Sequence, residues 1–360
     1  MTPEQRAESL QQARSTRSEP DIRVLRIGRF SRRFSTRGLL SAAGLGTLTV
    51  LLVLLALCLG DRPLSAQQVL EALLPEADRL DRMVVWQWRA PRALGAAIFG
   101  AFLGISGAVF QALTRNSLGS PDVIGLTTGA YSGVLVVLVA GGTGTLALAS
   151  GAVVGGLLTA LTVYLLAYRN GLQGFRLIVV GIAVGAMLTA LNTWFSVSSD
   201  LSVALRAAVW GAGTLATVQW SSLLVAAGIG AVFLLLVPPI ARGLRQLALG
   251  EDTAQMTGAR PERVKILAVI AGIGLVAAVT AISGPIPFIA LAAPHIARRL
   301  RRAGFFDPLG IAAVGAVLLT GADLLAQHAW PQAVLPVGVV AVLIGGAYLL
   351  WVLFRERGRG

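Results

Sequence analysis

Apolar residues occur in long uninterrupted runs along most of the chain, rather than in an alternating pattern. The runs 38–60, 126–168 and 177–199 contain no charged residue. A helix that crosses a bilayer needs about 20 apolar residues, so the first and third runs each hold one span and the second holds two. A strand of a membrane barrel would instead alternate in polarity over about ten residues. The pattern predicts a bundle of membrane-spanning helices.

The whole chain predicts an all-α polytopic membrane protein with about ten transmembrane helices. The segment 286–297 is the shortest of them and contains Pro287 and Pro294, so we expect a broken or partly re-entrant helix there. The spans are expected near 39–60, 93–113, 123–140, 145–168, 177–197, 221–241, 264–284, 286–297, 308–327 and 334–354.

Composition agrees with a membrane location. Hydrophobic residues make up 55% of the chain and charged residues only 13%, which leaves too little polar surface for a soluble protein of this size. The formal net charge of +13 would suit nucleic acid, but most basic residues fall on one side of the predicted spans. Because cytosolic segments carry an excess of Arg and Lys, we expect no nucleic-acid partner.

The same rule sets the expected orientation. An Arg-rich tail, residues 1–38, and the C-terminus are predicted to be cytosolic, and residues 39–355 form the transmembrane domain. The chain would then be a multi-pass protein of a bacterial cytoplasmic membrane, with its basic tail able to contact anionic lipid.

The chemistry of an enzyme or a motor is not found in the sequence. Lys265 is the only lysine and does not follow a Gly-rich loop, so the chain has no nucleotide-binding P-loop. With two histidines and one cysteine, it has no metal-ligating cluster. No bound cofactor is expected, and the energy for transport would come from a partner subunit. Asp323 lies well inside an apolar span, where it is either a hydrogen-bonded structural carboxylate or the proton relay of an ion-coupled carrier.

The cytosolic loop 247–264 predicts two short helices that a motor subunit could contact. Glu251 and Asp252 would lie in the first turn of one helix, where the helix dipole favours acidic residues. Gly258 is a suitable left-handed stop, and Pro261 suits the start of the next helix. An ordinary solvated loop is the alternative.

This loop resembles the coupling region of the iron-siderophore and vitamin B12 permease family of ATP-binding-cassette importers. Further motifs at similar spacing extend the resemblance over residues 40–355. They are Arg-Ala-Pro-Arg at 89–92, a Gly-rich segment at 100–111, Asn-Ser-Leu-Gly-Ser-Pro-Asp at 116–122, Pro-Phe-Ile-Ala-Leu-Ala-Ala-Pro at 287–294 and Leu-Pro-Val-Gly-Val-Val at 335–340.

The resemblance implies a type II importer permease fold, a second permease subunit, a cytosolic ATPase dimer and an external siderophore-binding protein. A heterodimer is expected, although a homodimer is also consistent. The residues of two motifs, at 116–122 and 287–294, are most similar to the ferric-enterobactin-type branch, so the expected cargo is a ferric siderophore of the catecholate type. Cobalamin or haem transport and an ion-coupled secondary carrier remain as alternatives.

The resemblance also implies roles for particular residues. Arg89 and Arg92 would dock the binding protein, although Asp78 and Asp81 could be their internal partners instead. The translocation gate would include Asn116, which could simply cap a helix, and Leu118. The residues expected to couple to the ATPase are Gly250, Glu251, Asp252, Ala254, Gly258 and Arg263, and those expected to line the pathway are Asn192, Ser196 and Ser198.

Two departures from the family pattern accompany these motifs. Ser117 stands where the family usually has a proline. Gln327 and Val334 stand where family members often carry an arginine and a glutamate in the outer loop. The second departure would be explained by a heterodimer whose other subunit supplies those charged groups.

Overall fold

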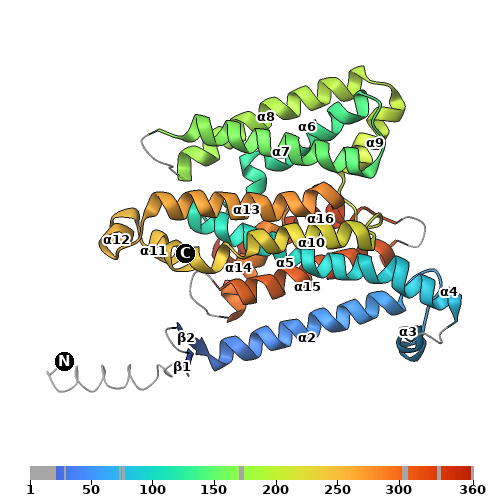
Figure 1. Ribbon diagram of the computed structural model, residues 1–360, viewed down its shortest axis with the longest axis horizontal. Helices are drawn as coiled ribbons and strands as arrows, with labels where there is room; N and C mark the ends of the chain where they lie inside the picture. Colours follow the sequence, from blue (N-terminus) through green and yellow to red (C-terminus); the bar gives the residue numbers. More distant parts are fainter. Residues whose placement is uncertain are drawn as a thin grey trace.

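The computed structural model describes residues 22–27, 30–72, 74, 78–169, 174–301, 307–330 and 334–357. Most of these residues are helical, and the long helices run along the longest axis of the molecule (Figure 1). This confirms the predicted all-α membrane fold. The long helices are α2 (Thr36–Cys58), α5 (Ala90–Thr114), α6 (Leu126–Val139), α7 (Thr145–Ala167), α8 (Gly174–Ser198), α10 (Trp220–Leu234), α13 (Pro261–Ser283), α14 (Ile289–Arg301), α15 (Pro308–His328) and α16 (Val337–Arg357).

Shorter elements connect the long helices. Figure 1 places α3 and α4 at one end of the molecule, and α12 with the beginning of α2 at the other. The short elements are α3 (Ala66–Ala72), α4 (Arg79–Arg82), the π-helix η1 (Met83–Arg89), the 3-10 helix η2 (Pro121–Ile124), α9 (Leu201–Gly211), α11 (Val237–Ala248) and α12 (Glu251–Met256).

Each predicted span corresponds to one of these helices, but not all of them are long enough to cross a membrane alone. Among the described residues, six helices are long and apolar enough to cross a membrane, and α10 with α11 makes a seventh if the bent pair is one span. The bend of 51° between α10 and α11 precedes Pro238 and Pro239, which cannot donate backbone hydrogen bonds into the preceding turn.

The expected short span at 286–297 is displaced as well as short. Its helix, α14, begins only at Ile289 and contains Pro294. The preceding backbone cannot be helical, because Gly284 and Phe288 have φ of 70° and 68°. The prediction of an irregular segment at this point is therefore confirmed, although its helix extends beyond the predicted end.

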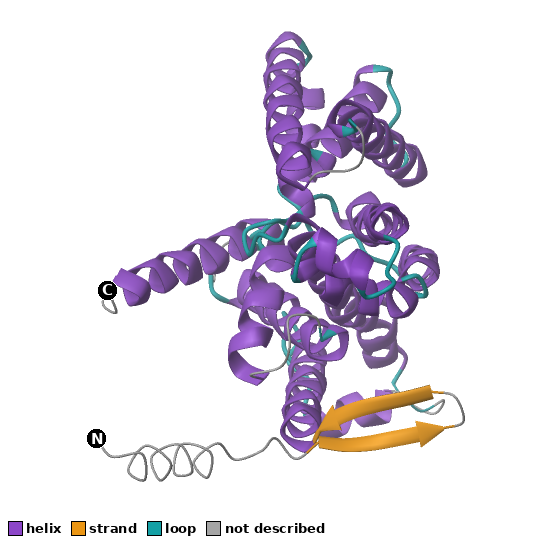
Figure 2. Ribbon diagram, turned by 90° about the vertical axis from the view of Figure 1, so that its left-hand side faces the viewer, coloured by secondary structure: helices purple, strands orange, loops and turns teal. Residues whose placement is uncertain are grey.

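Several elements were not anticipated from the sequence, and two of them are substantial. The first is α9, which occupies a region expected to be a loop. The second is an antiparallel hairpin of β1 (Ile22–Ile27) and β2 (Phe30–Ser35) within the basic tail, with Ile22 opposite Ser35. Figure 2 shows the hairpin at the lower edge of the molecule, where it extends sideways from the beginning of α2.

The core is centred on α5, which packs against α13, α14 and α15. Small residues allow this close packing, as the spacing of Gly100 and Gly104 predicts for helices in lipid. A Cβ atom added at Gly100 would overlap the carbonyl group of Gly315, and one added at Gly107 would overlap that of Ala290. The α5 backbone therefore lies directly against the backbones of α15 and α14.

Helices α6, α7, α8 and α9 form a second group beside this core (Figure 1). Within it, α6 and α7 pack closely at Gly133 and Gly155, where added Cβ atoms would overlap the facing backbone. In contrast, only 11% of the most apolar stretch of α8 is buried. The second group thus leaves a long apolar helix largely uncovered.

Candidate functional site

A cavity of about 630 Å³ lies between α6, α8, α9 and the segment that joins α13 to α14. Its polar lining consists of hydroxyl groups and one amide, and none of its lining residues is charged. The lining residues are Thr127, Thr128, Tyr131, Thr189, Asn192, Thr193, Ser196, Val197, Ala208, Gly211, Ala212 and Pro285.

Two of the three predicted pathway residues line this cavity. Asn192 is 6% exposed, and its amide donates a hydrogen bond to the carbonyl oxygen of Thr128 at 3.4 Å. Ser196 is also in the lining, whereas Ser198 is an exposed residue at the end of α8 and is not. Thr189 and Thr193 were not predicted from the sequence, although their spacing of three to four residues from Asn192 and Ser196 places all four on one face of a helix.

The turn after α5 contains both predicted gate residues. Arg115 adopts a left-handed conformation with φ of 50°. The Asn116 side chain accepts a hydrogen bond from the Leu118 N–H at 2.9 Å, while the Leu118 side chain is 56% exposed. Asn116 therefore closes a local turn, and Leu118 projects from that turn without being packed into the core.

A carboxyl group lies between this turn and the cavity. Asp122 is half-buried in η2 and hydrogen-bonds Thr127, one of the cavity residues. Burial raises the pKa of Asp122 to about 6, and the hydrogen bond from Thr127 partly opposes this increase. Asp122 can thus change its charge in a mildly acidic range beside the cavity.

The predicted coupling region contains one short helix, α12, as its sequence predicts, but its second helix is the first turn of the 23-residue α13 rather than a short helix. Glu251 and Asp252 lie in the first turn of α12, Gly258 has a φ of 82°, and Pro261 begins α13. Gly250, with a φ of 120°, precedes α12. Within α12, Ala254 is completely buried.

The outer surface of the coupling region carries both apolar and charged side chains. Leu249 and Met256 are 74% and 88% exposed, and Arg263 is exposed at the start of α13. A large exposed methionine beside charged residues is typical of a protein contact surface.

The structure places Arg89 against the end of α2. Its guanidinium donates hydrogen bonds to the carbonyl oxygens of Leu57 at 2.8 Å, Cys58 at 3.4 Å and Arg62 at 2.6 Å. A cation at this position satisfies carbonyl groups that have no partner within the helix. Arg89 thus joins the end of α2 to the start of α5.

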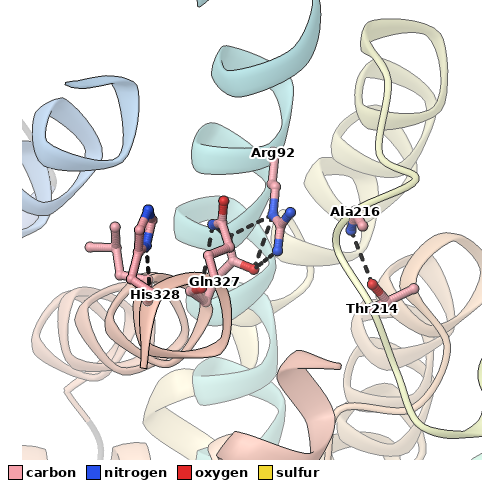
Figure 3. A network of polar contacts seen from close by, with 7 residues as sticks. Arg92, Thr214, Ala216, Gln327 and His328 are labelled. Carbon is pink, nitrogen blue, oxygen red and sulfur yellow. Dashed lines mark hydrogen bonds and ion pairs between the residues drawn. The ribbon is translucent and has the colours of Figure 1, made fainter. Parts of the chain in front are cut away.

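Arg92 contacts Asp323 of α15, and Figure 3 shows its side chain beside Gln327 of the same helix. Its Nη2 lies 2.8 Å from Asp323 Oδ1 and its Nε lies 3.0 Å from Oδ2. Gln327 donates a further hydrogen bond to Oδ2 at 2.8 Å. Since Asp323 is 2% exposed, this geometry favours the structural carboxylate over the proton relay.

The two acidic residues considered as partners of these arginines contact another residue. Arg62 lies 3.0 Å from Asp81 and 3.9 Å from Asp78. The alternative pairing expected from the sequence therefore does not form with Arg89 or Arg92. Only the tertiary contact between α5 and α15 reveals Asp323 as the partner of Arg92.

Comparison with known families identifies the chain. The model of the FecCD transport family matches residues 48–355, which include the cavity, the turn after α5 and the coupling region. The chain belongs to the FecCD transport family. It is therefore a membrane transport subunit rather than an enzyme, and the family resemblance found in the sequence is confirmed.

Individual relatives cover most of the chain. The ferric enterobactin transport system permease protein FepG of Escherichia coli K12 is 45% identical over 293 residues, covering 81% of this chain and 89% of FepG. The vitamin B12 import system permease protein BtuC of Klebsiella pneumoniae is 35% identical over 349 residues, covering 94% of this chain and 99% of BtuC.

A solved structure supports the fold independently. A protein described as an inward-facing ABC transporter assigned to the metal-chelate type superposes with a TM-score of 0.78 and 26% identity, covering 87% of this chain and 98% of that chain. The type II importer permease fold expected from the sequence is thereby confirmed.

Proposed function

We propose that this chain is a permease subunit of an ATP-driven importer that carries ferric siderophores of the catecholate, enterobactin-like type across a bacterial cytoplasmic membrane. The 45% identity to the ferric enterobactin permease over 81% of the chain carries this proposal. The chain functions with a second permease subunit, preferably a different one, a cytosolic ATPase dimer that binds ATP and Mg²⁺, and an external binding protein. Both of its termini lie in the cytosol.

The cavity is chemically suited to a large anionic complex. Its hydroxyl and amide groups can hydrogen-bond the oxygen atoms of a chelate, while the absence of charge from its lining avoids a strong electrostatic trap. Conduction requires sites that hold a cargo weakly enough to release it. Asn192 and Ser196 are accordingly assigned to the pathway, together with the threonines of α8.

The gate and the coupling surface complete the mechanism. The ATPase engages the exposed side of α12, which includes Asp252 and Met256. ATP binding moves α12, and the turn containing Asn116 and Leu118 changes the access from the cavity to the cytosol. The side chain of Leu118 is free to move because it is not packed into the core.

Arg89 and Arg92 support docking of the binding protein indirectly, by fixing the shape of the outer surface. The internal contacts of Arg89 and Arg92 hold the ends of α2, α5 and α15 together, and this rigid rim receives the binding protein. For either arginine to contact an acidic residue of the binding protein directly, it must give up one of these internal contacts. Rescue of R89E by charge reversal on the binding protein would demonstrate such direct docking.

Haem and cobalamin are the competing cargoes. Permeases for both are among the relatives, including the hemin permease HmuU of Yersinia pestis at 34% identity over 87% of this chain. The ion-coupled carrier is not retained, because the chain belongs to the FecCD transport family and Asp323 is paired with Arg92.

Uptake of labelled cargo tests the proposal. Cells lacking the gene, and the same cells with it restored, are supplied with ⁵⁵Fe as a catecholate chelate, a hydroxamate chelate or haem, and with labelled cobalamin. Loss and recovery confined to the catecholate chelate is expected. Loss confined to haem or cobalamin would replace the cargo, and unchanged uptake of every cargo in cells without a redundant importer would refute the function.

A further inference from the structure

A carboxylate joins three elements near the coupling region. Glu251 Oε2 of α12 lies 2.8 Å from the Nζ of Lys265 in α13. The other oxygen, Oε1, lies 4.0 Å from Nη2 of Arg115, which follows α5 directly. The Glu251 side chain of α12 therefore contacts both α13 and the turn that contains the predicted gate residues.

Lys265 is the fixed point of this arrangement. Its side chain is 5% exposed, although lysine is rarely buried unless it is paired. Besides Glu251, it binds Glu262 Oε1 at 3.1 Å. Because a buried ammonium needs its carboxylate partners, Lys265 holds Glu251 firmly against the beginning of α13.

Arg115 connects this fixed carboxylate to the gate turn. The turn is held together internally, since the N–H of Asn116 donates to Gln111 at 3.2 Å and the N–H of Gly119 donates to Asn116 at 3.0 Å. A Cβ atom added at Gly119 would overlap the hydroxyl of Thr114, so the turn is also tightly packed. A force on Arg115 therefore moves Asn116 and Leu118 together.

The backbone around α12 allows the helix to move as a unit. Gly250 and Gly258 flank it with φ of 120° and 82°, and glycine adopts such conformations without steric cost. A Cβ atom added at Gly258 would meet nothing within 4 Å, which shows that the second of these positions is open.

From these contacts we infer that Glu251 is a positioning residue that transmits movement of α12 to the gate turn through Arg115, while Lys265 keeps its carboxylate in place. The inference rests on the proposed function, because it requires that α12 is moved by an ATPase. It separates two acidic neighbours in one helical turn: Glu251 transmits the movement, whereas Asp252 is an exposed residue of the contact surface.

The first experiment measures coupling in the assembled importer. The complex with its ATPase and binding protein is reconstituted in proteoliposomes, and the amount of ferric catecholate siderophore transported per ATP hydrolysed is compared between variants. E251Q and R115Q are each expected to lower this ratio about fivefold, as loss of a partly exposed charge contact allows. The matched control is E71Q, the same substitution at an exposed glutamate of α3, which lies at the opposite end of the molecule from α12 (Figure 1). It is expected to remain within about twofold of the unaltered complex.

A double variant tests whether the two residues act through the same contact. If they do, E251Q/R115Q loses no more than E251Q alone, because the contact is already broken. Losses that add, or unchanged ratios in both single variants, would overturn the inference. Thermal melting of each purified complex identifies a variant whose loss of transport reflects unfolding.

A second measurement follows the gate directly. A spin label is attached at L118C after the native cysteine has been removed by C58S, and its mobility is recorded with and without ATP. The ATP-dependent change is expected in the E71Q background and is lost with E251Q. If the unaltered complex fails to transport the siderophore but the label still responds to ATP in this way, the proposed cargo fails while the transmission by Glu251 stands.

Discussion

Helices α5 and α8 are each 25 residues long and similarly apolar, yet they have opposite surroundings. The helix that includes α5 has 78% of its most apolar stretch buried, whereas α8 has 11%. α5 is surrounded by α13, α14 and α15, while α8 contributes four polar residues to the cavity. Similar hydropathy thus supports two different roles.

The difference indicates which helix stabilises the domain and which one lines the cavity. α5 has small residues and a charged group where other helices approach it, so its contacts are specific and closely packed. α8 has hydroxyl groups on the cavity side, and large apolar side chains such as Ile182 and Met187 remain more than half exposed. Changes in α5 should therefore affect stability, and changes in α8 should affect transport.

The largest expected effect follows from breaking the Arg92–Asp323 pair between α5 and α15. R92M leaves a buried carboxylate without its cation and should lower the free energy of unfolding by about 3–5 kcal/mol. Thermal unfolding in detergent measures this change. R92M/D323L is the control, since removing both charges should restore most of the stability. A single variant that melts like the unaltered protein would show that the pair contributes little.

A smaller loss of stability is expected from close packing. G107A places a methyl group against the carbonyl of Ala290 and should cost about 2–3 kcal/mol. The matched substitution in α8 is G185A, whose added Cβ would make an ordinary contact at 3.6 Å with Gly125. It should be neutral or slightly stabilising because alanine favours a helix. Equal melting of the two variants would contradict the comparison.

The α8 cavity should respond in transport rather than in stability. N192L removes the amide and fills part of the space, so initial uptake of the labelled siderophore should fall about tenfold, equivalent to about 1.4 kcal/mol. S198A is the control in the same helix, because Ser198 lies outside the cavity lining. Normal uptake by N192L at normal protein levels would remove Asn192 from the pathway.

The smallest effect concerns Asp122 beside the cavity. Its pKa is raised from 3.8 to about 6, so the folded protein holds this proton more tightly than the unfolded chain. The resulting stabilisation is present at low pH and is lost as the pH rises from about 4 to about 6. Because Asp122 is only half-buried, the change should be about 1 kcal/mol. D122N should remove this slope from a series of melting curves, and an unchanged slope would assign it to other groups.

Much of the fold was accessible from the sequence because the bilayer constrains each span locally. The runs at 38–60 and 177–199 predict α2 and α8 within a few residues. The helix α9 was missed because it is short, although the four-residue spacing of Leu201, Leu205 and Val209 is a helical signal. Its 11 residues are too few for a membrane span, so the segment does not stand out when the sequence is searched for long apolar runs.

The candidate site was only partly predictable. Local turn chemistry indicated α12, Gly258 and Pro261, since glycine and proline restrict the backbone where they stand. The pairing of Arg92 with Asp323 joins positions far apart in the chain, and the sequence left the carboxylate's role open. Likewise, Thr127 and Thr193 become parts of one cavity only when α6 and α8 lie side by side.

The sequence by itself determined that this protein is a multi-helix membrane permease, because hydropathy, turns and family motifs are properties of neighbouring residues. Only the tertiary structure decided which of two equally apolar helices is buried, which acidic residue pairs with Arg92, and which acidic residue of α12 reaches the turn after α5. These outcomes depend on helix packing, where the position of one glycine or one carboxylate relative to another helix decides whether two distant segments meet.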